Sequence, residues 1–137
     1  MKKRLTALMM MFLLLVCLGT NAYAALPETV VPLWDNIQST THFISFNGDV
    51  GSSTAIVYGK SGTTNVTGTL NVYEQTTSGW KLVGRDYGSV TTRELGLYVE
   101  FEAKPGAYYQ SVLNFSVTIN GVVETETLYE FATCPRN

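Results

Sequence analysis

The sequence predicts an all-β domain, a single sandwich of about seven antiparallel strands. From Thr40 onward the chain is rich in Thr, Val, Tyr and Phe, which favour strands, and glycines punctuate it at the expected turns. The strand-like segments follow one another at the short, regular spacing that is typical of sandwiches and barrels. No convincing helical periodicity and no internal repeat interrupts them. The predicted strands cover residues 41–47, 53–60, 64–75, 80–87, 93–102, 108–118 and 122–131.

A leader precedes the domain. Residues 2–4 are basic, residues 5–18 form an almost unbroken apolar run, and Ala22 and Ala24 flank Tyr23 in a small-x-small triplet. This three-part pattern predicts a secretory signal peptide over residues 1–24, cleaved after Ala24. The alternative is a retained membrane anchor, which needs about 20 apolar residues, more than this run provides. The sequence therefore predicts a secreted, extracellular protein.

Cleavage changes the charge and the cysteine count. The remaining 113 residues, 25–137, lose three of the nine basic residues and none of the eleven acidic ones, so the net charge goes from −2 to −5. Nucleic acids and anionic membranes need clustered positive charge, so neither is a predicted partner. Cys134 becomes the only cysteine and cannot form an internal disulfide. It is either an incidental tail thiol or the site of an intermolecular bridge.

The mature chain divides into three parts. Residues 25–39, with Pro27 and Pro32, are predicted to be an extended lead-in in which Leu33, Trp34 and Ile37 could dock on the domain. Residues 40–132 form the sandwich, and residues 133–137 form a C-terminal tail.

The register of the last hairpin depends on its loop length. A two-residue Asn120-Gly121 turn sets Glu124 and Glu126 on the core face, which is costly for carboxylates. A three-residue loop over residues 119–121 avoids this cost and is predicted instead. It aims Tyr129 and Phe131 at the core.

A three-residue loop, over residues 77–79, is also predicted for the middle hairpin. It places Trp80 and Leu82 on the core face and leaves Tyr73 and Tyr87 on the outer face.

The segment Lys104-Pro105-Gly106-Ala107-Tyr108-Tyr109, followed by a strand, a glycine turn and a final strand, resembles the closing hairpin of fibronectin type III and immunoglobulin-like sandwiches. The resemblance implies an immunoglobulin-like or fibronectin III-like fold in which Tyr109 is a corner tyrosine bonded to nearby backbone. The chain is also similar to an uncharacterised family of small secreted proteins of Gram-positive bacteria. That likeness uses Trp34 after the leader, the Gly79-Trp80 hairpin and the run over residues 120–125. The family carries no activity that could be transferred.

Catalytic signatures are weak. His42 is the only histidine, no Gly-x-Ser-x-Gly elbow presents a serine, and a partly buried or strand-end histidine is expected. The pairs Glu100 and Glu102, and Glu124 and Glu126, share strand faces at roughly 6.5–7 Å, a spacing that glycosidases can use. A solvated acidic face, which is common on exposed strands, is the favoured explanation. No metal site, no cofactor and no enzyme activity are predicted.

Tyrosine is the more informative surplus. Tyr73, Tyr87, Tyr98 and Tyr108 are predicted to face outward, where aromatic surfaces bind sugars and protein partners, although strand propensity alone also favours tyrosine. We therefore expect a non-catalytic extracellular binding module whose partner is a protein or a cell-wall glycan. A structural or assembly component of the cell surface or matrix is the alternative, and a small glycan-active hydrolase is a lesser one.

Overall fold

A computed structural model describes residues 33–136 of the chain. The predicted signal peptide with Ala22 and Ala24, and most of the lead-in, lie outside the described residues. The described part contains seven strands and no helix, and each strand lies where the sequence predicts one. They are β1 (Ile37–Asn47), β2 (Val50–Gly59), β3 (Thr63–Thr76), β4 (Gly79–Val90), β5 (Glu94–Glu102), β6 (Tyr108–Ile119) and β7 (Val122–Thr133).

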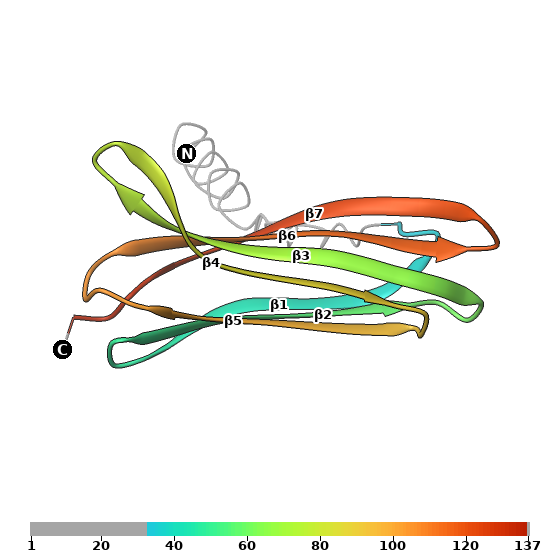
Figure 1. The fold of residues 1–137 in the computed structure, drawn as a ribbon, viewed down its shortest axis with the longest axis horizontal. Coiled ribbons are helices and arrows are strands. Elements are labelled where there is room, and N and C mark those ends of the chain that lie inside the picture. The colour runs from blue at the N-terminus through green and yellow to red at the C-terminus, as the bar shows by residue number, and fades with distance from the viewer. Residues whose placement is uncertain (1–32, 137) are drawn as a thin grey trace, which may run out of the picture. The chain divides into compact units, whose positions relative to one another are not determined.

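The strands form two antiparallel sheets that lie face to face (Figure 1). The smaller sheet has the order β1-β2-β5 and the larger one the order β4-β3-β6-β7. The chain crosses between the sheets after β2, β4 and β5, so hairpins alternate with crossovers as in Greek-key sandwiches. The predicted fold class, a single immunoglobulin-like sandwich of seven antiparallel strands, is confirmed.

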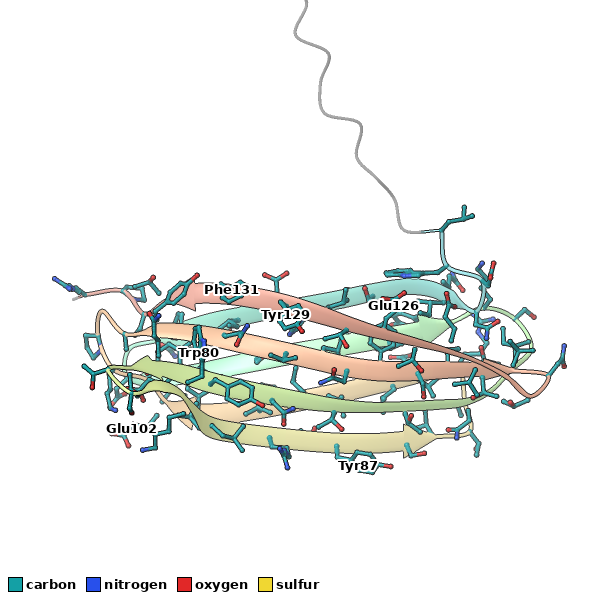
Figure 2. All side chains as sticks on the ribbon, turned by 90° about the horizontal axis from the view of Figure 1, so that it is seen from above. Trp80, Tyr87, Glu102, Glu126, Tyr129 and Phe131 are labelled. Atoms are coloured by element: carbon teal, nitrogen blue, oxygen red, sulfur yellow. The ribbon has the colours of Figure 1, made fainter. Side chains whose placement is uncertain are left out.

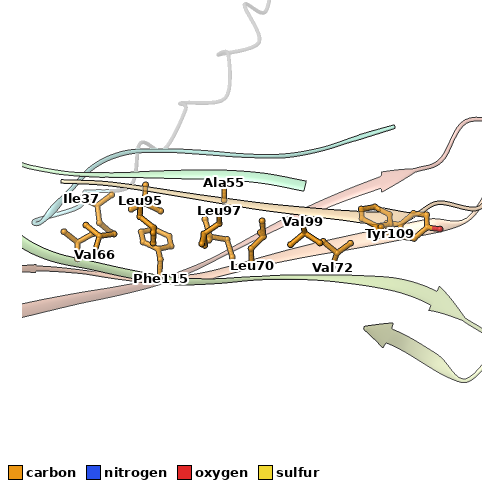
Figure 3. Packing of buried hydrophobic residues seen from close by; sticks show 14 of the residues in the cluster. Ile37, Ala55, Val66, Leu70, Val72, Leu95, Leu97, Val99, Tyr109 and Phe115 are labelled. Carbon is orange, nitrogen blue, oxygen red and sulfur yellow. The ribbon is translucent and has the colours of Figure 1, made fainter. Parts of the chain in front are cut away.

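The core lies between the sheets and consists of aliphatic side chains with a few aromatic rings (Figure 3). Every second residue of β5 and β6 is buried, as alternation predicts for strands with one face in water. Leu70 and Leu113 pair on β3 and β6 with no exposed surface, and Leu97 of the facing sheet is 3% exposed. The two sheets therefore share one continuous apolar layer.

Inward-facing glycines allow β4 to lie close to β5. A Cβ atom added to Gly84 would meet Val99 Cγ1 at 2.3 Å, and one added to Gly88 would meet Leu95 Cδ1 at 2.6 Å. On the same edge, the Asp86 carboxylate accepts a hydrogen bond from the Tyr98 backbone N–H at 2.9 Å. This bond pairs a backbone donor on the free edge of β5 with a side chain of the other sheet.

The corner tyrosine is present. Tyr109 is fully buried, and its phenol oxygen accepts a hydrogen bond from the Lys104 backbone N–H at 2.8 Å. Its ring packs on Phe101 and Phe46, with centroid distances of 4.9 and 5.7 Å. Glu74 lies beside this corner with 7% of its surface exposed, and its carboxylate accepts two hydrogen bonds from Lys104 Nζ at 2.7 and 3.0 Å. The carboxylate raises the pKa of Lys104.

The predicted loop of the last hairpin is wrong. Ile119 pairs with Val122 across a two-residue turn in which Asn120 and Gly121 have φ angles of 51° and 78°. Positive φ at both positions is what the type I′ turn requires and what Asn-Gly readily adopts. Tyr129 and Phe131 consequently lie on the outer face, with 56% and 49% of their surface exposed, instead of in the core.

Glu124 faces inward, and backbone N–H groups donate hydrogen bonds to its carboxylate. Its carboxylate accepts hydrogen bonds from the N–H groups of Asp35, Asn36 and Ile37 at 3.1, 2.6 and 3.1 Å. The penalty that argued against the two-residue turn is thereby offset, because these bonds replace water around the charge. They also tie the start of β1 to β7.

The middle hairpin is displaced from its prediction in the same way. Thr76 pairs with Gly79, so the loop has two residues rather than three. Trp80 and Leu82 therefore face outward, with 43% and 42% of their surface exposed. An extra residue, Val83, interrupts the pairing between β3 and β4 and restores the predicted register for the rest of β4.

The domain begins a few residues earlier than predicted. Ile37 starts β1 and is 1% exposed, and Trp34 packs against the core. The side chain of Asn36 donates to the backbone oxygens of Val117 and Val122 at 3.1 and 2.9 Å. Leu33, which was expected to dock, is 97% exposed.

Candidate binding face

The outer face of the four-stranded sheet carries a group of exposed apolar side chains at one end. We call this group the aromatic cluster; its members are Trp80 and Leu82 on β4, Tyr108 on β6, and Tyr129 and Phe131 on β7. Each is between 37% and 56% exposed. Figure 2 looks onto this face and shows Trp80, Tyr129 and Phe131 together near one end of the sheet.

Three rings of the cluster are in mutual contact. Tyr108 and Phe131 stack at a centroid distance of 5.9 Å with an interplanar angle of 13°. Trp80 lies 6.1 Å from Tyr108 and 6.4 Å from Phe131, so side chains of three strands form one platform. Ring pairs of this kind contribute about 0.5–1.5 kcal/mol each beyond the area they bury. The β3–β4 hairpin tip that carries Trp80 bends away from the smaller sheet, toward the side of the cluster (Figure 1).

Most of the other outward positions of the same face carry hydroxyl and amide side chains; the exceptions include Arg85, Tyr87, Val112 and Val123. We call this region the polar field; its members are Asn65, Thr67, Thr69, Asn114, Ser116, Thr118, Thr125 and Thr127. Neighbours are bonded across strands: the Thr67 and Ser116 hydroxyls lie 2.7 Å apart, and Thr127 donates to Asn114 Oδ1 at 2.8 Å. The field continues the row of outward positions that begins at the cluster.

Charge is nearly absent from this face. At the outward-facing positions of the four strands, all of which lie within residues 33–136, Arg85 is the one charged side chain. Its Nε donates to Asn71 Oδ1 at 2.6 Å. The outer face of the other sheet is acidic by contrast, because β5 presents Glu94, Glu100 and Glu102 there. The domain therefore has one acidic and one nearly uncharged face.

The four predicted binding tyrosines do not form one site. Tyr73, Tyr87 and Tyr108 lie on the face just described, but Tyr73 is only partly exposed and Tyr87 lies along β4 beside the polar field. Tyr98 is exposed on the opposite sheet, where its hydroxyl donates to Glu100 at 3.2 Å. Only Tyr108 belongs to the aromatic cluster. The other four members were missed because the predicted hairpin registers placed them in the core.

His42 is partly buried, as predicted, and lies in a polar network between the sheets. Its Nε2 is 2.8 Å from Ser111 Oγ, which in turn is 2.7 Å from Ser53 Oγ. Burial lowers the pKa of His42 to about 4. Both serines are completely buried, so neither hydroxyl is placed to attack a substrate from solvent. The network joins β1 to β2 and β6.

The two glutamate pairs have different surroundings. Glu124 faces inward and accepts hydrogen bonds from the backbone at the start of β1, so it does not belong to a solvated acidic face. Glu100 and Glu102 are exposed on β5 and border a shallow hollow of about 340 Å³ with Asp49, Val50 and Phe101. In residues 33–136 no three His, Cys, Asp or Glu side chains are arranged to hold a metal ion.

The Cys134 thiol is not placed for an intermolecular bridge, which was one of the two roles that the sequence left open. It is 1% exposed, and the backbone of Cys134 bonds that of Ala107 and Gly106. A bridge would require the tail to leave the domain, because a disulfide needs the two sulfurs in contact.

Across the described range, no helix has the length and hydropathy that a bilayer span requires.

The fold and the site define a small β-sandwich domain whose larger sheet has a nearly uncharged outer face with an aromatic cluster at one end. No family model matches the chain, and no curated protein matches it in sequence. Among solved structures it is similar to R. palustris CsgH, with a TM-score of 0.43 and 12% identity over 67% of this chain and 90% of that one. It is also similar to a protein from Archaeoglobus fulgidus, with a TM-score of 0.41 and 8% identity over 74% of this chain and 98% of that one. Similarity at this level concerns the architecture alone.

Proposed function

We propose that this domain is a non-catalytic binding module that acts outside the cell, and that the aromatic cluster is its contact surface. The observation that carries the proposal is that five large apolar side chains lie half-exposed at one end of the face, and that ring contacts hold three of them, Trp80, Tyr108 and Phe131, together. Contiguous exposed apolar surface on a soluble domain marks an interaction site. Trp and Tyr are also the residues that most often dominate binding energy.

The placement of these side chains argues against strand propensity as their sole cause. Propensity would distribute aromatic residues over all outward positions of the sheet. The outward positions of the polar field carry Thr, Ser and Asn instead, and most of the outward aromatic residues gather at one end, Tyr87 beside the polar field being the exception. The extracellular location rests on the leader pattern and on the resemblance to small secreted proteins of Gram-positive bacteria.

An envelope-binding assay with cluster variants tests the proposal. The purified protein is incubated with the producer's own envelope fraction, and the bound fraction is compared with that of the Trp80→Ala, Phe131→Ala double variant. Tyr98→Ala is the matched control, because it removes an equally exposed aromatic ring from the other sheet. We expect at least a tenfold loss of binding for the double variant and none for the control. Equal binding by all three proteins would show that the cluster is not the contact surface.

An assembly role is the second candidate, and exposed apolar residues at one sheet edge favour it. Val122 and Val123 at the start of β7 are 65% and 59% exposed. Sedimentation of the purified protein distinguishes the two candidates. Self-association that is lost on Val123→Thr would support assembly, whereas a strict monomer at high concentration would remove that role.

A further inference from the structure

We propose that the ligand of this face is an uncharged polysaccharide chain that lies along the strands, from the aromatic cluster across the polar field. This inference rests on the proposed function and assigns its ligand class. Two halves of one surface carry it: a ring platform at one end, and a row of hydroxyl and amide groups that continues from it.

The dimensions of the face favour an extended ligand. Tyr108 and Thr118 mark the two ends of the outward row on β6, ten residues apart. At about 3.4 Å per residue the row is about 34 Å long, far longer than a monosaccharide or a small metabolite needs. The outward positions of β3 run beside it over the same distance. A linear oligosaccharide of several units can therefore lie along both strands at once.

The side-chain chemistry matches both surfaces of a sugar ring. A pyranose ring presents a face of C–H groups, which packs on aromatic rings such as Trp80 and Tyr108. Its edge presents hydroxyls, which need partners that both donate and accept. Thr, Ser and Asn side chains do both, whereas a carboxylate only accepts and an ammonium only donates. All members of the polar field are Thr, Ser or Asn, whose side chains both donate and accept hydrogen bonds.

The charge distribution favours a neutral polymer over a charged one. The face has a single charged group, Arg85, which is already bonded to Asn71. A polyanion or a polycation bound there would lose hydration without gaining a counter-charge. The acidic positions Glu94, Glu100 and Glu102 lie on the opposite face of the domain, where they cannot contact the same chain. A polycation would be attracted to that other face.

Binding to defined polysaccharides tests the inference. The probes are insoluble cellulose and chitin as neutral polymers, heparin as a polyanion and chitosan as a polycation, each measured by co-sedimentation or affinity electrophoresis. We expect the protein to bind at least one neutral polymer through this face and the polyanion not at all.

Two variants separate the cluster from the polar field. The Thr69→Val, Thr127→Val variant removes the two hydroxyls that flank Asn114 in one cross-strand row and keeps side-chain shape in strands that favour valine. We expect it to bind the neutral polymer at least about fivefold more weakly, the cost of one lost hydrogen bond. Thr54→Val makes the same change on the outer face of the smaller sheet and should leave binding unchanged.

The outcomes distinguish failure of this inference from failure of the proposed function. If no neutral polymer binds, or if the threonine variant binds it as well as the unmodified protein does, the polysaccharide inference is wrong. If the cluster variants still lose envelope binding in that case, the binding module remains and its ligand belongs to another class. If envelope binding is also insensitive to Trp80→Ala and Phe131→Ala, both proposals fall.

Discussion

Replacing Glu124 with alanine is expected to lower the free energy of unfolding by about 2–4 kcal/mol. The carboxylate accepts three backbone hydrogen bonds, from Asp35, Asn36 and Ile37. Bonds to a charged group contribute about 1.5–3 kcal/mol each, but the N–H of Asp35 is exposed and can bond to water once the carboxylate is removed. The loss therefore comes mainly from the two partly buried donors.

Urea unfolding of the purified protein measures this loss. Glu126→Ala is the matched control, because Glu126 is the next inward residue of β7 and its carboxylate has no hydrogen bond to residues 33–136. We expect a loss below about 1 kcal/mol for the control, since removing a partly exposed carboxylate that has no hydrogen bond to the described residues costs little. If the two variants are equally stable, Glu124 does not stabilise the start of β1 and the two-residue register has lost its physical explanation.

Three further predictions concern the core and the acidic hollow. Burial lowers the pKa of His42 to about 4, so we expect the free energy of unfolding to fall by at most about 2 kcal/mol as the pH drops from about 7.5 to 5. Urea unfolding over this pH range measures the decrease, which should be smaller for the His42→Gln variant. Gly84→Ala should cost about 1–3 kcal/mol in thermal or urea unfolding because its Cβ meets Val99, whereas Gly96→Ala, with open space around it, should be neutral. Glu100→Gln with Glu102→Gln should leave any glycan binding and any hydrolysis of glycan substrates unchanged, and loss of a hydrolytic activity would restore the hydrolase hypothesis.

The sign of the histidine effect follows from which state binds the proton. In the unfolded chain His42 titrates near its usual pKa of about 6.5, and in the folded domain only near 4. Between these values the unfolded state holds more protons, so acidification favours unfolding. Stability from the neutral imidazole is complete above the unfolded pKa and is lost progressively below it. A stability curve that is flat between pH 7.5 and 5 would contradict the burial of His42.

Strand positions were predictable because they depend on local composition and alternation. All seven strands were found from β-forming residues and glycine turns, and the corner tyrosine was found from the segment Lys104–Tyr109. Both signals are contained in a few consecutive residues. Neither depends on which side of the sheet a distant segment covers.

The registers of two hairpins were not predictable by the rule used for them. Burial of Glu124 looked prohibitive because its three backbone donors lie 87 to 89 residues earlier in the sequence. Asn120-Gly121 is itself a strong local signal for a two-residue turn. The expected cost of burying the Glu124 carboxylate argued against that turn, but hydrogen bonds from residues 35–37 offset this cost. In the middle hairpin, the extra residue Val83 confines the change of register to the part of β4 before it. The alternation of the rest of β4 agrees with the predicted register and therefore gives no sign of the change.

The error in register determined the error in the site. A one-residue shift moves every side chain of a strand segment to the other face of its sheet. Tyr129 and Phe131 on β7, and Trp80 and Leu82 on β4, were therefore assigned to the core although they form most of the outer cluster. The sequence predicts a site of four outward tyrosines instead, and only Tyr108 of these belongs to the cluster.

The fluorescence of Trp80 provides the most direct test of the binding face. The chain has two tryptophans, so Trp34→Phe leaves Trp80 as the sole indole, 43% exposed on the aromatic cluster. Iodide quenching is then measured without ligand and with a saturating soluble neutral polysaccharide. We predict efficient quenching of the free protein and strong protection on binding, with no protection by heparin. An indole that iodide cannot reach in the free protein would contradict the register, and binding without protection would contradict the proposed face.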